Sequence, residues 1–574
     1  MNVESGLNLK QYIIRRIPIL EWLPRYNLSK FLQDFLAGLT VGLTVIPQGI
    51  AYAIIAGLPA QYGLYSSFMG CFVYVVFGSC KEITVGPTAI MALLSQSHVI
   101  NLGADVAVLL CFLSGCVISI MGLLHLGFLV EFVSMPVISG FTNAAAIIIG
   151  TSQLGTLLGL TGKSDSFIDA VVKVADHLND IRLWDTVLGV CSMILLKLRG
   201  KKNGTWWQKL MWVTSLARNA VVVVIGIILS YSLFSHGIKP FRITGNITKG
   251  LPPFAPPPFS IVKGNKTYDF KEIVGELGST TISVPLIAIL ESIAIAKAFA
   301  KGKTVDANQE MLALGLCNIF GSFSRSMPST GSFTRTAVNN ASGVKTPMGG
   351  VITGCFVLLA CGLLTSTFEY IPKATLAAVI IVAIVAGMYF NAHRYVYPNH
   401  VRRYEIPIDL IPLTVTLFSC LAIGPEYGMI AGIAVNLILL LYFAARPGLL
   451  IEERVIDGLK ILFVSPKQSL SYPAAEYLRE QVMSWSVMSA ETIPVIVEGR
   501  HVVRIDATVA KNLALLSTDL KAREQKLMFW NWCEEPRRTL IRYDATLTMS
   551  FRNSGSIAQV FSAEIASSHV PRST

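Results

Sequence analysis

Charged residues are scarce in this chain. Asp, Glu, Lys and Arg together make up 14% of its 574 residues, whereas hydrophobic residues make up 53%. A water-soluble domain carries roughly 25% charged residues, and a disordered chain contains few hydrophobic ones. The composition therefore excludes both a water-soluble globular protein and a disordered chain.

Paired cysteines of the kind that bind zinc or exchange electrons are also absent. None of the ten cysteines forms a C-x-x-C pair, so the sequence indicates neither a zinc site nor a disulfide framework. It also contains no metal-ligand cluster, nucleophile motif or phosphate-binding loop. We therefore predict a protein that is not an enzyme and that uses no metal and no cofactor.

The net charge of +12 does not indicate a nucleic-acid partner. The basic residues stand at the ends of apolar runs rather than among aromatic residues, as the positive-inside rule of membrane proteins predicts. Residues 1–33 are basic and lack the apolar region of a signal peptide. We expect these residues to form a cytosolic N-terminal segment.

Apolar runs of roughly membrane-spanning length follow one another from residue 34 to residue 445. They predict an α-helical polytopic membrane protein with about fourteen segments, which places both termini in the cytosol. From residue 452 onward the composition is that of a soluble domain. The expected segments are 34–55, 62–78, 87–98, 104–124, 133–154, 184–197, 217–235, 281–300, 308–324, 332–342, 347–367, 373–389, 407–424 and 426–444.

The loop of about 45 residues between the seventh and eighth segments has extracytosolic features. It contains two N-glycosylation sequons, at Asn246 and Asn265, and a proline-rich patch at Pro252–Pro258. A third sequon, at Asn203, falls in a predicted cytosolic loop. We therefore expect glycosylation at Asn246 and Asn265 only.

Corresponding irregularities in the two halves of the chain indicate an internal repeat. Pro47 interrupts the first segment and Pro285 the eighth, and the third and tenth segments are both short. Gln48 and Thr88 are separated by about 40 residues, as are Glu291 and Phe333. Paired short or broken helices predict a transporter built from two inverted repeats, here of seven segments each.

Two half-helices that begin inside the membrane direct their positive N-termini and free N–H groups toward a shared cavity, which can bind an anion. Arg335 stands in the first turn of the tenth segment, where a cation requires a nearby anion or carboxylate. Polar side chains near the same points can extend the site. These predicted site residues are Gln48, Tyr52, Thr88, Ser332, Thr334 and Arg335.

Structural roles remain open for several of these residues. Arg335 can pair with an internal carboxylate, the hydroxyl groups can serve as helix caps, and Tyr52 can be a packing residue. Glu291 stands alone in the apolar run from Val284 to Ala296. It is either a structural partner of Arg335 or Lys297, or a buried carboxylate that couples proton movement to transport.

Several motifs of the chain resemble the sulfate permease family (SulP, solute carrier family 26), and within it the sodium-independent sulfate anion transporter branch. They are Pro47–Tyr65, Phe77–Pro87, Gly140–Ala146, Asn308–Asn318 and Thr330–Ala337. The resemblance implies a seven-plus-seven fold with core and gate domains that move as an elevator in a homodimer. It places an anion between the third and tenth segments, with Gln48, Tyr52, Thr88, Ser332, Phe333, Thr334 and Arg335 at matching positions.

Glu291 matches a carboxylate that is associated with proton-linked or electroneutral sulfate transport in relatives. The tail, residues 452–574, resembles a cytosolic α/β STAS domain, which contributes contacts to the dimer. Its sequence predicts strands near 459–464 and 494–498 and an N-cap at Asp506. The stretch from Phe529 to Glu535 and the residues after Asp544 depart from the STAS pattern.

The expected function is sodium-independent secondary transport of sulfate, by proton symport or by anion exchange. The second hypothesis is an uncoupled chloride conductor of the same family. The presence of Glu291, which matches the carboxylate of coupled relatives, argues against this hypothesis. Chloride, bicarbonate and oxalate remain alternative substrates because hydroxyl and backbone donors accept several anions. The plasma membrane and the lysosomal membrane are both open as locations.

Overall fold

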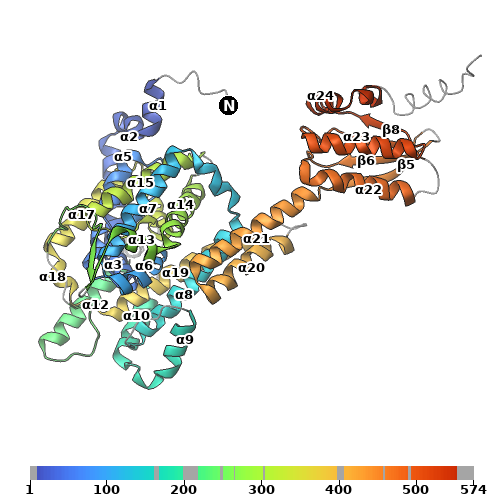
Figure 1. Cartoon of the computed structure of the whole chain (residues 1–574). Coiled ribbons are helices and arrows are strands. Elements are labelled where there is room, and N and C mark those ends of the chain that lie inside the picture. The colour runs from blue at the N-terminus through green and yellow to red at the C-terminus, as the bar shows by residue number, and fades with distance from the viewer. Residues whose placement is uncertain are drawn as a thin grey trace, which may run out of the picture. The chain divides into compact units, whose positions relative to one another are not determined.

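A computed structural model describes the chain except for residues 1–8, 161–166, 198–217, 246–249, 264–265, 301–303, 397–405, 457–458, 489–492 and 553–574. The chain forms two compact units, Met1–Val435 and Asn436–Thr574. The first is helical and the second is built around a sheet (Figure 1).

Each of the fourteen predicted segments coincides with a helix or a pair of helices. In the first half these are α3 (Leu28–Ile55), α4 (Gln61–Tyr65) with α5 (Met69–Phe77), α6 (Ala89–Leu102), α7 (Asp105–Leu123), α8 (Met135–Leu157), α10 (Leu183–Lys197) and α12 (Arg218–Ser235). In the second half they are α14 (Thr280–Phe299), α15 (Ala307–Phe323), α16 (Phe333–Ser342), α17 (Gly349–Leu363) with α18 (Thr365–Phe368), α19 (Lys373–Val396), α20 (Ile406–Ile423) and α21 (Pro425–Ala445).

Six helices of the described chain are long and apolar enough to cross a membrane by length and composition alone. The predicted half-helices α6 and α16 are shorter, with 14 and 10 residues. The helical architecture is therefore confirmed, and its division into two inverted repeats of seven stays a prediction.

Within the described part of the first unit, four shorter α-helices lie outside the predicted segments: α1 (Leu9–Arg16), α2 (Ile19–Trp22), α9 (Phe167–Asp176) and α13 (Phe270–Leu277). In addition, α3 begins at Leu28, before the predicted start at Asp34. The reason is a cap, because the side chain of Asn27 accepts a hydrogen bond from the N–H of Lys30 at 3.0 Å. Apolar content alone does not reveal such polar helix starts.

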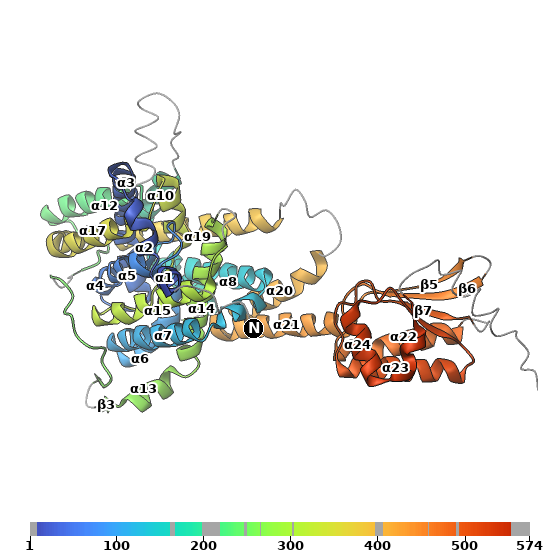
Figure 2. The same cartoon turned by 90° about the horizontal axis from the view of Figure 1, so that it is seen from above.

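Two sets of helices in the first unit, which Figure 2 shows from above, pack closely among themselves. In the first, α15 packs against α7 and α5, and α17 packs against α3 and α5; we call this group the α15 bundle. In the second, α8 packs against α19 and α20, and α10 packs against α19; we call it the α8 bundle. Within the α15 bundle, α7 and α15 cross so closely that a Cβ atom added to Gly315 would lie 2.7 Å from the backbone nitrogen of Ser119.

The chain segments that lead into α6 and α16 are paired with each other. The two-residue strands β1 (Val85–Gly86) and β4 (Thr330–Gly331) form an antiparallel ladder. Helices α6 and α16 begin directly after these strands. The two halves of the sequence therefore bring their short helices to one place, as the repeat pattern predicted.

The start of α3 is tied to the connection between α16 and α17 by a buried carboxylate. Asp34, which is 0% exposed, accepts hydrogen bonds from the N–H groups of Lys345 (2.7 Å) and Thr346 (3.1 Å). It also accepts from the hydroxyl groups of Thr346 (2.6 Å) and Tyr26 (3.3 Å). One side chain thus accepts four hydrogen bonds from two other parts of the chain, Tyr26 and Lys345–Thr346.

We expect the Asp34→Ala substitution to destabilise the first unit by about 3 kcal/mol, because it leaves several buried donors without an acceptor. The Tyr26→Phe substitution removes only the longest of these hydrogen bonds and should cost less than about 1 kcal/mol. Thermal unfolding of the detergent-solubilised variants measures both effects. Equal melting temperatures for the Asp34 variant and the wild type would contradict the assigned role.

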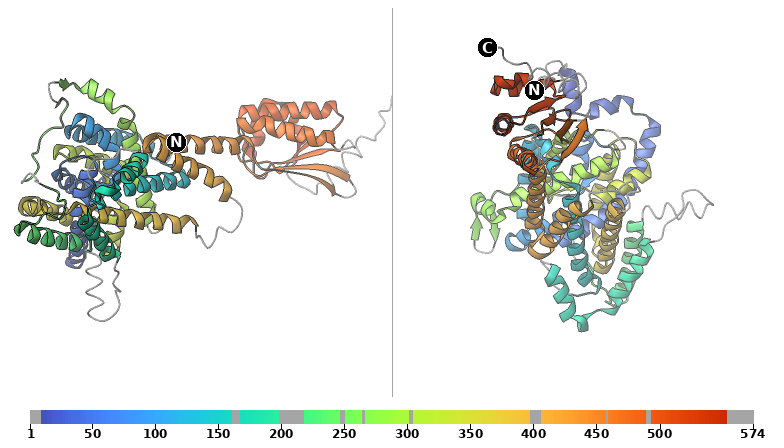
Figure 3. Two further views of the ribbon diagram at one scale, coloured as in Figure 1. Left: turned by 90° about the horizontal axis from the view of Figure 1, so that it is seen from below. Right: turned by 90° about the vertical axis from the view of Figure 1, so that its right-hand side faces the viewer.

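The second unit is an α/β domain, as the tail sequence predicted. Its five strands lie in the order β5-β6-β7-β8-β9, with β5 antiparallel to β6 and the others parallel. Helices pack on one side of this sheet (Figure 3, left). The elements are β5 (Leu449–Ile456), β6 (Leu459–Pro466), α22 (Ala475–Met488), β7 (Val495–Glu498), α23 (Ala507–Ala522), β8 (Leu527–Trp530), α24 (Glu534–Tyr543) and β9 (Phe551–Arg552).

Two local features of this unit bear on the sequence predictions. The side chain of Asp506 accepts a hydrogen bond from the N–H of Val509 at 2.9 Å, so the predicted N-cap of α23 is confirmed. The stretch from Phe529 to Glu535, which departs from the STAS pattern, forms the end of β8 and the start of α24.

Candidate functional site

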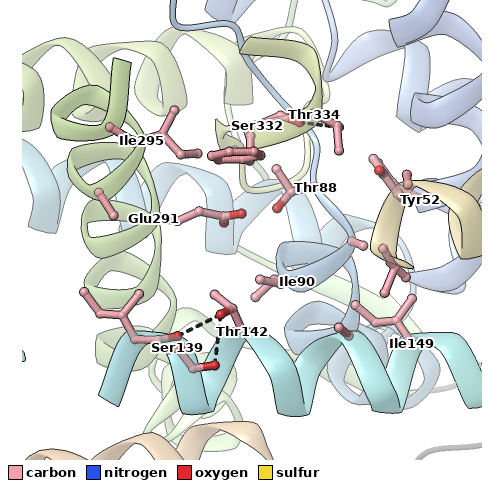
Figure 4. A pocket seen from close by; sticks show the side chains of 18 of the residues that line it. Tyr52, Thr88, Ile90, Ser139, Thr142, Ile149, Glu291, Ile295, Ser332 and Thr334 are labelled. Atoms are coloured by element: carbon pink, nitrogen blue, oxygen red, sulfur yellow. Dashed lines mark hydrogen bonds between the residues drawn. The ribbon is translucent and has the colours of Figure 1, made fainter. Parts of the chain in front are cut away.

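A cavity of about 210 Å³ lies where the two bundles meet. Its wall is formed by α3, α6, α8, α14, α16 and α19, so both halves of the sequence contribute (Figure 4). The N-terminal ends of α6 and α16 lie in this wall. The cavity therefore lies where the two short helices begin, and its role as an anion site stays a prediction.

Most of the predicted site residues line the cavity, and two do not. The residues in the wall are Tyr52, Thr88, Glu291, Ser332, Phe333 and Thr334. Gln48 is 1% exposed and lies behind the wall, and Arg335 is 0% exposed and also lies outside the lining. The residues that the sequence analysis selected therefore meet around one cavity, but the sequence did not reveal which of their side chains face it.

The N-cap residues of the two half-helices differ. Thr88 caps α6, because its hydroxyl oxygen accepts from the N–H of Met91 at 3.4 Å. Ser332 precedes α16 without forming a side-chain cap, and its hydroxyl lies 3.3 Å from that of Thr334. The first N–H groups of a helix have no partner within the helix, so the start of α16 leaves donors near the cavity.

Arg335 connects the two half-helices from behind the wall. It belongs to the first turn of α16, and its Nη1 donates to the carbonyl of Pro87, 2.8 Å away, just before α6. Its Nε and Nη2 atoms have no hydrogen-bond partner among the described residues. A buried guanidinium group with two unpartnered nitrogen atoms provides a positive potential at the cavity, although its side chain does not line the cavity.

Glu291 projects from α14 into the cavity, and its carboxyl group points toward Thr88 (Figure 4). One carboxyl oxygen, Oε2, has no hydrogen-bond partner among the residues that the structure describes. In the described part of the chain, Glu291 forms no ion pair with Arg335 or with Lys297. The geometry therefore gives no support to the alternative in which Glu291 is a structural ion-pair partner.

Helices α8 and α19 contribute residues that the sequence analysis did not select. These residues are Ser139 and Thr142 of α8 and Ala383 and Ile384 of α19. The hydroxyl of Thr142 donates to the carbonyls of Ile138 (2.9 Å) and Ser139 (3.1 Å). The sequence feature that could have indicated Thr142 is the motif Gly140–Ala146, which contains this residue. The motif does not indicate the direction in which the Thr142 side chain points.

Asn246 and Asn265, the expected glycosylation sites, lie outside the described residues. Within the described residues, no group of three or more His, Cys, Asp or Glu side chains is placed to hold a metal ion. The described wall of the cavity offers hydroxyl groups, helix N-termini and the carboxyl group of Glu291, and the guanidinium of Arg335 lies buried outside this wall.

Comparison with known proteins shows the family of the chain. The model of the sulfate permease family matches residues 31–408. The chain is 43% identical over 522 residues to the sodium-independent sulfate anion transporter of Bos taurus, which covers 88% of this chain and 85% of that protein. It is 31% identical over 574 residues to the chloroplastic sulfate transporter 4.1 of Arabidopsis thaliana, covering 93% of this chain and 80% of that protein.

Solved structures show the same fold at low sequence identity. A structure of SLC26A9 superposes with a TM-score of 0.83 at 21% identity and covers 98% of this chain and 95% of that one. The transmembrane domain of a cyanobacterium bicarbonate transporter, BicA, gives a TM-score of 0.55 at 19% identity, over 71% of this chain and 98% of that one. These relatives are transporters and not enzymes, and the chain is a membrane protein of the sulfate permease family.

Proposed function

We propose that this protein carries sulfate across a membrane by sodium-independent secondary transport. The observation that carries the proposal is the pair of short helices, α6 and α16, that begin at one cavity between two helix bundles. The 43% identity to a bovine sodium-independent sulfate anion transporter supports sulfate as the substrate. We infer an elevator-type mechanism, in which the α15 bundle carries the anion past the α8 bundle.

The anion would lie between the N-terminal ends of α6 and α16. The hydroxyl groups of Tyr52, Thr88, Ser332 and Thr334 can donate to the oxygen atoms of a tetrahedral oxyanion, and Phe333 supplies an apolar wall. Arg335 compensates part of the double negative charge through its field. Gln48 stays a predicted contact that, in this conformation, does not line the cavity.

Glu291 is the proposed proton-coupling group. It is the carboxylate in the cavity wall, and it faces the half-helix that begins after Thr88. A proton on this group offsets negative charge that enters with sulfate. Proton symport and exchange against another anion are both compatible with this arrangement.

A second candidate is an exchanger of chloride, bicarbonate or oxalate, or an uncoupled chloride conductor. The observation that favours it is the donor set of the cavity, because hydroxyl groups and helix N-termini do not require two negative charges on the anion. The carboxyl group of Glu291 in the cavity wall counts against an uncoupled conductor.

We further propose residues 34–445 as the transporter domain and residues 452–574 as a STAS domain that, with residues 1–33, lies in the cytosol. The five-stranded sheet and helices of the second unit support the STAS assignment. A homodimer with contacts in the membrane and STAS domains is inferred from family membership. The plasma membrane and the lysosomal membrane are the proposed locations.

The proposed topology predicts N-glycosylation of Asn246 and Asn265 when the protein is made in animal cells. Digestion with peptide-N-glycosidase should then increase the electrophoretic mobility of the wild type but not that of an Asn246→Gln/Asn265→Gln variant. A shift that persists in the double variant would show that the loop assignment is wrong, and an Asn203→Gln variant provides the control.

The decisive experiment is uptake of labelled sulfate by proteoliposomes in the absence of sodium. One set receives an inward proton gradient, and a second set contains internal chloride as a counter-anion. Uphill uptake driven by protons alone establishes symport, and uptake that needs an internal anion establishes exchange. The absence of sulfate flux under both conditions would overturn the sulfate proposal and favour the second candidate.

A further inference from the structure

The half-helix α6 has its two ends in different surroundings. Its N-terminal residues Ala89 and Ile90 line the cavity, and it ends at Leu102. Fourteen residues of α-helix span about 21 Å, so the far end of α6 lies well away from the anion site. The last carbonyl groups of any helix need donors from outside the helix.

A lysine from a distant loop supplies those donors. The ammonium group of Lys263 donates to the carbonyl of Ile100 at 2.9 Å and also to the carbonyl of Asn101. The N–H of Gly103 donates to the carbonyl of Val99 at 2.8 Å. Lys263 therefore satisfies two carbonyls of the last turn that the helix itself leaves without a donor, and it places a positive charge at the negative end of the helix dipole.

Lys263 is held in place by a small hairpin. It ends strand β2 (Ile261–Lys263), which pairs with β3 (Lys266–Tyr268). Ile261 is 2% exposed, and the nearby ring of Phe259 packs edge-on against Phe112 of α7 with ring centroids 5.7 Å apart. The lysine is thus carried by a segment that is itself packed against the α15 bundle.

The chain that precedes the hairpin docks on the same bundle. The N–H of Ala255 donates to the carbonyl of Phe323 at the end of α15, 3.0 Å away. The ring of Phe254 stacks on that of Phe323 with centroids 5.7 Å apart. The part of this loop from Phe254 to Lys263 therefore contacts α6, α7 and α15. Its earlier part is bonded instead to the segment that leads into α19, because the N–H of Lys373 donates to the carbonyl of Arg242 at 2.8 Å.

The other half-helix, α16, is terminated in a different way. Gly343 follows it with φ +87°, and the N–H of Gly343 donates to the carbonyl of Asn340 at 3.1 Å. A glycine in this left-handed conformation is a common helix terminator. Of the two half-helices, α6 thus receives a charged side chain from a remote loop. Helix α6 therefore connects that loop to the proposed anion site.

We propose that Lys263 is a positioning residue for the anion site, which fixes the far end of α6 and thereby the place of its N-terminus at the anion. A helix transmits such a constraint because its backbone is rigid over this length. The inference rests on the proposed function for its choice of sulfate as the anion, but the position of Lys263 does not depend on that choice. Energetic coupling of this kind is reciprocal, so anion binding must also tighten the contact of Lys263 with α6.

The first test compares Lys263→Met with Lys266→Met in proteoliposomes. Lys266 lies on the same hairpin, with its ammonium 4.3 Å from the ring centroid of Tyr268, and provides a matched control. We expect the KM for sulfate to rise roughly two- to fivefold in the Lys263 variant, with little change in maximal rate. Lys263→Arg, which keeps a cation with several donors, should restore most of the affinity.

Equal KM values for the two methionine variants would overturn the proposal. A fall in maximal rate at unchanged KM would also overturn it, because this would indicate loss of folded protein rather than a displaced site.

The second test uses the wild-type protein, so that it does not depend on the folding of a variant. Purified protein is treated with a water-soluble amine-acetylating reagent in sulfate, in chloride and in gluconate at equal ionic strength, and peptides are quantified by mass spectrometry. Sulfate should slow acetylation of Lys263 at least twofold relative to Lys266. Equal rates in the presence and absence of every anion would overturn the role of Lys263, whereas protection by chloride and not by sulfate would support it and overturn the choice of sulfate.

Discussion

The Arg335→Ala substitution is expected to abolish saturable sulfate uptake. The guanidinium lies directly behind the cavity, fully buried, and its Nη1 is bonded to the carbonyl of Pro87 at the start of α6. The substitution removes both the positive potential at the site and the link between the two half-helices. Loss of a charge-assisted interaction of about 2–3 kcal/mol corresponds to a roughly 30- to 150-fold weaker affinity for the anion.

Two further variants separate a role in binding from a role in folding. Arg335→Met keeps an unbranched apolar stem but removes the buried cation, two of whose nitrogen atoms lack partners among the described residues. Burial of an unpaired charge costs free energy, so we expect this variant to be inactive and to melt no lower than the wild type. Inactivity with retained stability would show that Arg335 is needed for transport and not for folding, as is typical of functional residues that lower the stability of a protein.

The matched control is Arg325→Ala. Arg325 lies between α15 and β4 and forms an ion pair with Asp105 at 2.8 Å, outside the cavity wall. Partly exposed ion pairs contribute little, so uptake by this variant should stay close to that of the wild type. An unchanged KM in Arg335→Ala would remove Arg335 from the site.

The positions of the membrane helices could be predicted from the sequence because the signal is continuous. Apolar runs of fixed length reflect one physical requirement, the thickness of the bilayer, and fourteen runs located fourteen helical segments. The convergence of α6 and α16 could be predicted for a similar reason. Prolines and glycines at matching places in the two halves mark breaks in helices, and such breaks are costly unless they line a site.

The direction of individual side chains could not be predicted in the same way. Arg335 and Thr334 are neighbours in one helical turn, yet Thr334 lines the cavity and Arg335 is buried behind it. The rotation of α16 about its axis is fixed by the pairing of β1 with β4 and by hydrogen bonds such as that of Arg335 to Pro87, and these contacts join residues far apart in the sequence. The role of Lys263 could not be predicted for the same reason, because the carbonyl groups that it contacts belong to α6, which is far away in the sequence.

The Glu291→Gln substitution is expected to flatten the pH dependence of sulfate uptake. The carboxyl group faces the cavity, and its buried Oε2 lacks a hydrogen-bond partner among the described residues. The proposed coupling role requires that this group bind and release a proton during transport. Ionised, it repels a dianion; protonated, it does not. Wild-type uptake should therefore rise as the side that supplies sulfate is acidified.

Glutamine has nearly the same shape as glutamate but carries no charge and exchanges no proton. The variant should thus behave at every pH as the wild type does when Glu291 is protonated, with no decline in sulfate affinity toward alkaline pH. Uphill uptake driven by an imposed proton gradient should disappear, while exchange against an internal anion should persist. Measurement of both fluxes in the same proteoliposomes shows whether coupling alone has been lost.

Glu272→Gln is the control for a general effect of charge, since Glu272 is an exposed residue of α13 outside the cavity wall. This variant should keep the pH profile and the proton-driven uptake of the wild type. If Glu291→Gln also keeps them, Glu291 has a structural role and the coupling proton must be bound elsewhere. If it loses both while exchange survives, the carboxylate facing Thr88 is the group that binds the proton, and sulfate and proton share one cavity between α6, α14 and α16.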